Sequence, residues 1–244
     1  MERSPTFWEL AVQATTSTRQ GYNLLAPRFE RTPYATPAWI IKVCLERVEQ
    51  LHGPLEREGA RGLDLGCGTG RASLALAESC QRVDGIDFSP LMLAEAKSKT
   101  AHLENTIFDF QEKDMATLEL PAAAYDRIVT FGAWGHILVP WRQRLVAECV
   151  KALKPGGVFA TVTADPASVL SRRWWYSLAF DTGLRLRNAI LAEPFHMYYR
   201  LNATPQVRDL FARVGEVEVR LEPIPRKPHR ELTLLMARRN LKDS

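Results

Sequence analysis

The stretch LDLGCGTG, residues 63–70, joins an apolar strand directly to a turn with a glycine at every second position. A helix is expected to begin at Arg71, and a second strand over 82–87 ends in Asp87. Glycines let the backbone approach a ligand closely, and a carboxylate at the end of the neighbouring strand can accept hydrogen bonds from ribose hydroxyls. This order of elements predicts a cradle for a nucleotide-like cofactor in an α/β fold.

The glycine spacing separates this turn from the dinucleotide fingerprint G-x-G-x-x-G, which places backbone amides against a pyrophosphate. Gly66, Gly68 and Gly70 are evenly spaced, and Arg71 stands where the third glycine of that fingerprint would be. An acid, Asp64, also lies on the first strand. The pattern resembles that of class I S-adenosylmethionine-dependent methyltransferases, whose cofactor has no phosphate and carries an ammonium group. A nicotinamide oxidoreductase is a more distant alternative.

Alternating apolar strands and amphipathic helices run through most of the chain, which is typical of an α/β sheet with helices on both faces. The resemblance covers about residues 20–164 and 204–239, and it is closest to the small-molecule, type 11/25-like branch. It implies a Rossmann-like sheet of order 3-2-1-4-5-7-6 with an antiparallel last hairpin. The expected strands lie at about 61–66, 82–87, 106–112, 125–131, 158–163, 216–221 and 232–237.

Three segments complete the expected organisation. A lid segment over 1–34 precedes a methyltransferase domain over 35–244, and an aromatic insertion over 165–204 follows the fifth strand. Such a long connection suggests a substrate lid, and a dimer contact or a membrane-surface helix would use the same residues. The K-P-G-G stretch at 154–157 is expected to end a helix of about 139–153, because its glycines permit left-handed backbone.

The resemblance implies which residues surround the cofactor. Asp64 and the backbone of the glycine turn would surround its methionine end, and Asp87 would bind the ribose. Phe88 would pack on the adenine, with simple core packing as the alternative, and Asp114 would accept the adenine amino group, with the capping of a helical turn as the alternative. The complete set of expected cofactor contacts is Tyr22, Asp64, Gly66, Cys67, Gly68, Asp87, Phe88, Met92, Asp114, Met115 and Phe131.

The segment TFGAWGH, residues 130–136, leaves the fourth strand at the carboxyl end of the sheet, where open α/β folds place their sites. His136 is a candidate general base, because an imidazole titrates near neutral pH; a hydrogen bond that braces the loop is an equal alternative. The segment lacks the Asn- or Asp-Pro-Pro-aromatic tetrad that methyltransferases of base amines often carry. The candidate acceptor contacts are Trp134, Trp175, His196 and Tyr198.

Composition excludes several classes of protein. The net charge of +4 is spread along the 244 residues, with dense basic pairs at 226–227 and 238–239 near the end, so no nucleic-acid partner is expected. The four cysteines form no C-x-x-C pair, which predicts neither a metal site nor a disulfide framework. Because no signal peptide or membrane span is evident in the sequence, we expect a cytoplasmic protein. The oligomeric state stays open, with a homodimer as one option.

The sequence therefore predicts a methyltransferase that uses S-adenosylmethionine and acts on an oxygen or nitrogen of a small organic acceptor. One alternative is a methyltransferase for protein or RNA. Another is a catalytically silent subunit that binds the adenosyl cofactor and works through its aromatic insertion.

Overall fold

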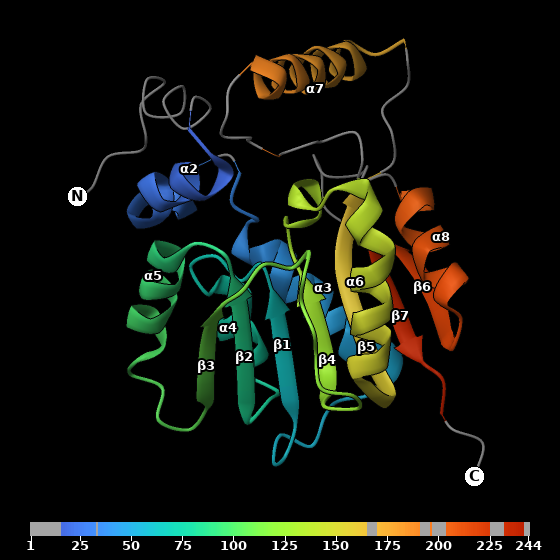
Figure 1. Ribbon diagram of the computed structural model, residues 1–244. Coiled ribbons are helices and arrows are strands. Elements are labelled where there is room, and N and C mark those ends of the chain that lie inside the picture. Colours follow the sequence, from blue (N-terminus) through green and yellow to red (C-terminus); the bar gives the residue numbers. More distant parts are fainter. Residues whose placement is uncertain are drawn as a thin grey trace.

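The computed structural model describes residues 16–32, 34–164, 170–190, 196, 204–224 and 232–241. Its centre is a seven-stranded sheet of order β3-β2-β1-β4-β5-β7-β6, which confirms the expected topology (Figure 1). Strands β1 to β5 are parallel, whereas β7 runs antiparallel to both β5 and β6. The strands are β1 (Arg61–Leu65), β2 (Arg82–Asp87), β3 (Ile107–Glu112), β4 (Tyr125–Thr130), β5 (Leu153–Ala164), β6 (Val217–Pro223) and β7 (Leu232–Arg239).

Helices cover both faces of this sheet. On one face, α3 (Ala38–His52) and α4 (Arg71–Leu76) share a core with Val83 and Val129 of the strands. On the other, α6 (Val139–Ala152) and α8 (Thr204–Val214) pack over Leu63 and Ile128. Because both faces are buried, the parallel strands are almost continuously apolar.

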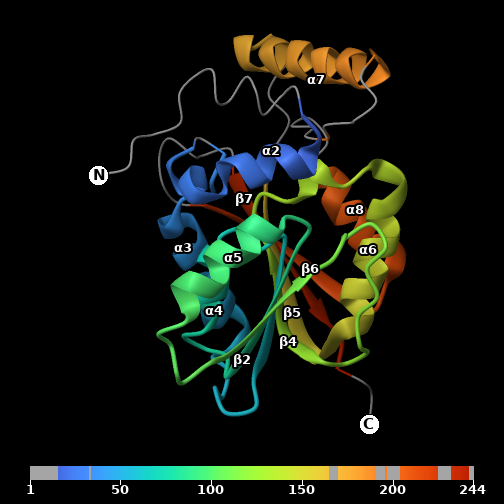
Figure 2. The same cartoon turned by 60° about the vertical axis from the view of Figure 1, so that its left-hand side comes forward.

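Further helices lie at one edge and at one end of the sheet. Helix α5 (Pro90–Thr100) packs against β2 and β3, and its N-terminus is capped by the Ser89 hydroxyl, which accepts from the amide of Met92 at 3.2 Å. At the carboxyl ends of the strands lie α2 (Thr18–Leu25), η1 (Ala26–Arg31) and η2 (Trp134–His136). Helix α7 (Arg172–Ile190) lies across the same end, outermost in both views (Figure 2).

Two local predictions differ from the structure. Helix α6 ends because Leu153 is already extended, with φ −65° and ψ 138°, so the glycines of 154–157 do not end it. They lie inside β5 instead, where Gly156 has φ +79° and the pairing with β4 shifts register between Tyr125 and Arg127. The insertion is not only a connection, because it contains the 19-residue α7. Most of the connection between the last two expected strands, residues 225–231, lies outside the described residues.

Candidate active site

Glycine is required at two positions of the 63–70 turn. Gly66 has φ +68°, and a Cβ there would lie 2.5 Å from the Cβ of Ala133. Gly70 has φ +82°, and its added Cβ would lie 3.0 Å from the Cβ of Ala96 in α5. A Cβ on Gly68, by contrast, would meet nothing closer than the ring of Phe29 at 3.9 Å. The turn is therefore packed tightly on its protein side and is open toward a cavity.

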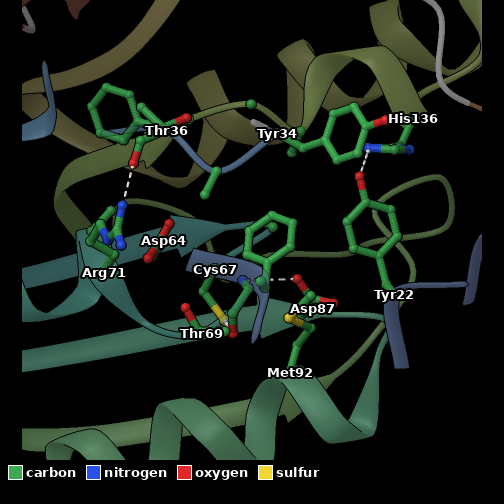
Figure 3. A pocket seen from close by; sticks show the side chains of 18 of the residues that line it. Tyr22, Tyr34, Thr36, Asp64, Cys67, Thr69, Arg71, Asp87, Met92 and His136 are labelled. Atoms are coloured by element: carbon green, nitrogen blue, oxygen red, sulfur yellow. Dashed lines mark hydrogen bonds between the residues drawn. The ribbon is translucent and has the colours of Figure 1, made fainter. Parts of the chain in front are cut away.

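That cavity lies at the carboxyl ends of β1, β2 and β4 (Figure 3). The N-terminal segment α2–η1 supplies part of its wall, so residues far apart in sequence enclose one space. Most of the expected cofactor contacts line it, together with the candidate base. These residues are Tyr22, Asp64, Gly66, Cys67, Gly68, Asp87, Phe88, Met92, Met115, Phe131 and His136.

Asp87 ends β2 with a buried carboxylate held by two backbone amides. Its Oδ2 accepts from the amide of Gly68 at 2.9 Å, and its Oδ1 accepts from the amide of Ser89 at 2.8 Å. Burial raises the pKa of Asp87 to about 6, against the lowering effect of these hydrogen bonds. A carboxylate has about four acceptor positions. Asp87 can therefore accept two further hydrogen bonds, as a ribose diol would donate.

Asp64 is fully buried beside Asp87, and one of its carboxylate oxygens is available to a ligand. Its Oδ2 accepts from the Ser73 hydroxyl at 2.7 Å, whereas Oδ1 has no hydrogen-bond partner among the described residues. Burial, and to a lesser extent the charge of Asp87, raises the pKa of Asp64 to about 7. An open, buried carboxylate oxygen costs free energy until a donor reaches it. A cationic ammonium group is the donor that fits this position.

A hydrogen-bonded chain crosses the opposite wall of the cavity. The hydroxyl of Tyr22 lies 2.9 Å from Nε2 of His136, and Nδ1 of His136 contacts the carbonyl oxygen of His196 (Figure 3 shows the first contact). A carbonyl can only accept, so Nδ1 carries the proton, Nε2 is the acceptor, and Tyr22 donates to it. Burial lowers the pKa of His136 to about 4, which keeps the imidazole neutral at physiological pH.

Arg142 of α6 fixes the turn that carries His136. This buried guanidinium donates from Nε to the carbonyl of Ile137 at 2.8 Å and from Nη2 to the carbonyl of Trp134 at 2.9 Å. Trp134 itself does not line the cavity, contrary to its expected contact with the acceptor. Its indole packs in the core and donates to the hydroxyl of Thr161 at 2.9 Å, because the turn directs the ring down toward β5.

The remaining expected contacts lie outside the cavity lining. Asp114 is exposed and its Oδ1 accepts from the amide of Ala116 at 2.8 Å, the local capping role that was the alternative. Trp175 lies on α7 and is 59% exposed. His196 reaches the site through its backbone carbonyl, which accepts from His136. Tyr198 lies outside the described residues.

A cluster around Glu30 is missing from the sequence predictions. Glu30 of η1 accepts from the Thr69 hydroxyl at 2.9 Å and pairs with Lys99 and with Arg71, the latter at 2.8 Å. Burial alone would raise the pKa of Glu30, but the hydrogen bonds from Lys99, Arg71 and Thr69 lower it to about 2. Arg71 also donates to the carbonyl of Thr36 at 2.9 Å. These bonds hold the N-terminal segment over the glycine turn.

Comparison with known proteins agrees with this geometry. A family model for a methyltransferase domain matches residues 63–157. This part of the chain is a methyltransferase domain of the class I S-adenosylmethionine-dependent type. The cofactor of this methyltransferase is S-adenosylmethionine, and Asp64 Oδ1 and Asp87 offer acceptors that suit its ammonium and ribose groups. Among the described residues, no three His, Cys, Asp or Glu side chains gather as metal ligands would.

Relatives of the methyltransferase carry different names. A probable S-adenosylmethionine-dependent methyltransferase from Mycolicibacterium smegmatis is 32% identical over 64% of this chain and 52% of its own length. An S-adenosyl-L-methionine-dependent Diels-Alderase from Talaromyces variabilis is 32% identical over 60% of this chain and 53% of its own length. The match thus spans about half the length of these relatives.

The fold of the methyltransferase also matches a solved structure. The DhpI–SAH complex superposes with a TM-score of 0.64 at 18% identity, over 96% of this chain and 99% of the other. In the part of the chain that the structure describes, no helix has both the length and the apolar composition needed to cross a membrane.

Proposed function

We propose that this protein transfers a methyl group from S-adenosylmethionine to an oxygen or nitrogen of a small organic acceptor. The observation that carries the proposal is the Tyr22–His136 pair, which borders the same cavity as Asp64 and Asp87. A proton acceptor beside a cofactor cradle is what methylation of a hydroxyl or an amine requires. The absence of the Asn- or Asp-Pro-Pro-aromatic tetrad after β4 favours a small acceptor over a nucleic-acid base.

In this proposal the residues around the glycine turn hold the cofactor. Asp87 accepts hydrogen bonds from the ribose, Asp64 pairs with the ammonium group, and Phe88 and Met92 form the apolar wall that receives the adenine. When bound, the cofactor supplies an electrophilic methyl group on a cationic sulfur. The protein contributes mainly orientation, and proximity alone can supply roughly 7–11 kcal/mol of the barrier.

Tyr22 and His136 receive the proton that the acceptor loses. Nε2 of His136 already accepts from Tyr22, so the acceptor's proton reaches it either by replacing the Tyr22 hydroxyl or by passing through it. The low pKa of His136 means that this base does not remove a proton in advance. It takes the proton as the acceptor atom forms its new bond and becomes acidic, while the carbonyl of His196 stabilises the imidazolium through Nδ1.

Two measurements test the function. Calorimetry should detect binding of S-adenosylmethionine and of its demethylated product, and incubation with a panel of hydroxyl- and amine-bearing metabolites should release that product. Binding of a nicotinamide cofactor without binding of the adenosyl cofactor would contradict the proposal. The Diels-Alderase relative gives a second candidate, an enzyme that keeps its cofactor unchanged. That candidate predicts conversion of a substrate with no methyl group consumed.

The affinity for S-adenosylmethionine is expected to rise with pH between about 5 and 7. Without cofactor, Asp64 and Asp87 hold protons up to pKa values of about 7 and about 6. In the complex both are ionised, so binding releases protons. For each of the two groups, the affinity falls by at most about tenfold for every pH unit below the pKa of that group. Calorimetry in buffers of different ionisation enthalpy measures the release.

Asp64→Asn should remove the proton release near pH 7 and keep the one near pH 6. Asp209→Asn, an exposed acid on α8, is the matched control and should leave the pH profile as it is. An unchanged profile for Asp64→Asn would contradict the assignment of Asp64 to the ammonium group.

A further inference from the structure

Helix α2 acts on both ring nitrogens of His136. Tyr22 reaches Nε2 directly, and its ring stands at 88° to the imidazole with the two centroids 5.0 Å apart. Thr18 precedes Tyr22 by four residues and lies on the same side of α2. Its hydroxyl oxygen accepts from the amide of His196 at 2.7 Å, and the carbonyl of His196 contacts Nδ1 of His136. Helix α2 therefore reaches Nδ1 as well, through the backbone of a single residue.

The carbonyl of His196 decides which nitrogen of His136 carries the proton. The hydroxyl of Tyr22 can donate or accept, so it is compatible with either neutral form of the imidazole. A carbonyl can only accept, so it selects the form with the proton on Nδ1 and leaves Nε2 as an acceptor. In the other neutral form, Nε2 would donate to Tyr22, and His136 could not take a proton from the methyl acceptor.

The place of this carbonyl depends on contacts with the start of α2. Residue 196 belongs to neither a helix nor a strand, so the regular hydrogen bonds of such an element do not direct its carbonyl. Its amide is held by Thr18, which is 178 positions away in the sequence. Arg187, in the last turn of α7, donates to the carbonyl of Thr16 at 2.8 Å. Two parts of the insertion are thus fastened to residues 16–18.

We propose that Thr18 is a positioning residue for the base. It holds residue 196 where the carbonyl meets Nδ1 of His136, and it thereby keeps Nε2 in the accepting form. Thr18 itself does not line the cofactor cavity, so it acts through His136 and not on a ligand. The inference rests on the proposed function, in which His136 takes the proton of the methyl acceptor.

NMR of the ¹⁵N-labelled histidine rings tests the assignment without any methyl acceptor. The full chain is used, and the signals of His136 are identified by their absence in His136→Asn. In the wild type, Nδ1 should have the shift of a protonated nitrogen and Nε2 that of an unprotonated one. Thr18→Val keeps a branched side chain but removes the oxygen that holds residue 196. Both nitrogens of His136 should then move toward intermediate shifts, because the two neutral forms compete.

Turnover is the second measurement. Thr18→Val should lower the turnover number roughly two- to tenfold, because it removes one hydrogen bond of ordinary strength. The affinity for S-adenosylmethionine should stay nearly unchanged. Thr18→Ser keeps the oxygen and should restore both the shifts and the turnover of the wild type. In a His136→Asn background, Thr18→Val should cause no further loss, because its effect passes through His136.

Ser17→Ala is the matched control. The Ser17 hydroxyl caps α2 and accepts from the amide of Gln20 at 3.2 Å, so this variant loosens the same end of the helix and leaves the oxygen of Thr18 in place. It should keep the wild-type shifts and turnover. Equal changes in Ser17→Ala and Thr18→Val would show a general loosening of α2 and would overturn the proposal.

The remaining outcomes separate this inference from the proposed function. Wild-type shifts in Thr18→Val, or a proton on Nε2 in the wild type, would overturn the role of Thr18. So would altered shifts with unchanged turnover in a protein that does transfer methyl groups. Altered shifts in Thr18→Val, in a protein that transfers no methyl group, would contradict the proposed function and still support Thr18 as the residue that positions the imidazole.

Discussion

His136→Ala is expected to lower the turnover number by about 10²-fold or more, with nearly unchanged affinity for S-adenosylmethionine. Nδ1 of His136 is engaged with the carbonyl of His196, so Nε2 is the nitrogen that can receive a proton. The imidazole stands beside the cofactor cavity without contacting the acids that bind the cofactor in the proposed function. Steady-state kinetics and calorimetry on the same preparation separate the two effects.

Tyr22→Phe examines the other half of the pair. The phenyl ring keeps the ring contacts of Tyr22 with Phe29 and Phe88, at centroid distances of 5.7 Å and 6.0 Å, and only the hydroxyl is lost. If the proton passes through Tyr22, turnover falls by a similar factor, and the double variant is no slower than the slower single one. Wild-type turnover in both single variants would show that catalysis rests on proximity.

Two further variants serve as controls for His136. His136→Asn retains a donor for the carbonyl of His196, so it should keep the turn in place and still lose turnover. His52→Ala removes a partly buried imidazole at the C-terminus of α3, away from the cavity, and should leave turnover at the wild-type level. A loss of activity in His52→Ala as large as that in His136→Ala would indicate general destabilisation.

The cradle could be predicted because its signals are local in the sequence. Gly66 and Gly70 are required by backbone geometry and close contacts, and Asp87 is the last residue of its strand, so a short motif specifies them. The contact of Glu30 with Arg71 and Lys99 has no such motif. It depends on how the N-terminal segment lies over α4 and α5, which periodicity does not encode.

The same distinction explains the residues around η2. A histidine after β4 could be predicted from the segment 130–136, but its partners could not. The contact with Tyr22 joins residues 114 positions apart, and the carbonyl of His196 carries no side-chain signal at all. Trp134 was expected to contact the acceptor because it lies in the segment that leaves β4 at the carboxyl end of the sheet. In a turn, however, a shift of one position along the chain changes which side chain faces the cavity. Here the side chain of Trp134 faces the core.

Asp87→Ala is expected to weaken the binding of S-adenosylmethionine by roughly 2–4 kcal/mol, because two hydrogen bonds to a charged acceptor are lost. The substitution also removes the acceptor of the Gly68 and Ser89 amides, so part of the loss will come from a less ordered glycine turn. Calorimetry with the cofactor gives the dissociation constant, and a thermal midpoint on the same sample reports the structural part.

Asp84→Asn separates these contributions. Asp84 is a buried acid on the same strand, but it binds Arg61, Arg82 and Tyr125 and does not line the cavity. Its replacement weakens a buried ion-pair network and should lower the thermal midpoint, while the cofactor dissociation constant stays near the wild-type value. Asp87→Ala should do the reverse, with a loss of affinity that exceeds what its change in stability explains. If both variants lose affinity in proportion to stability, Asp87 supports the turn and does not bind the ribose.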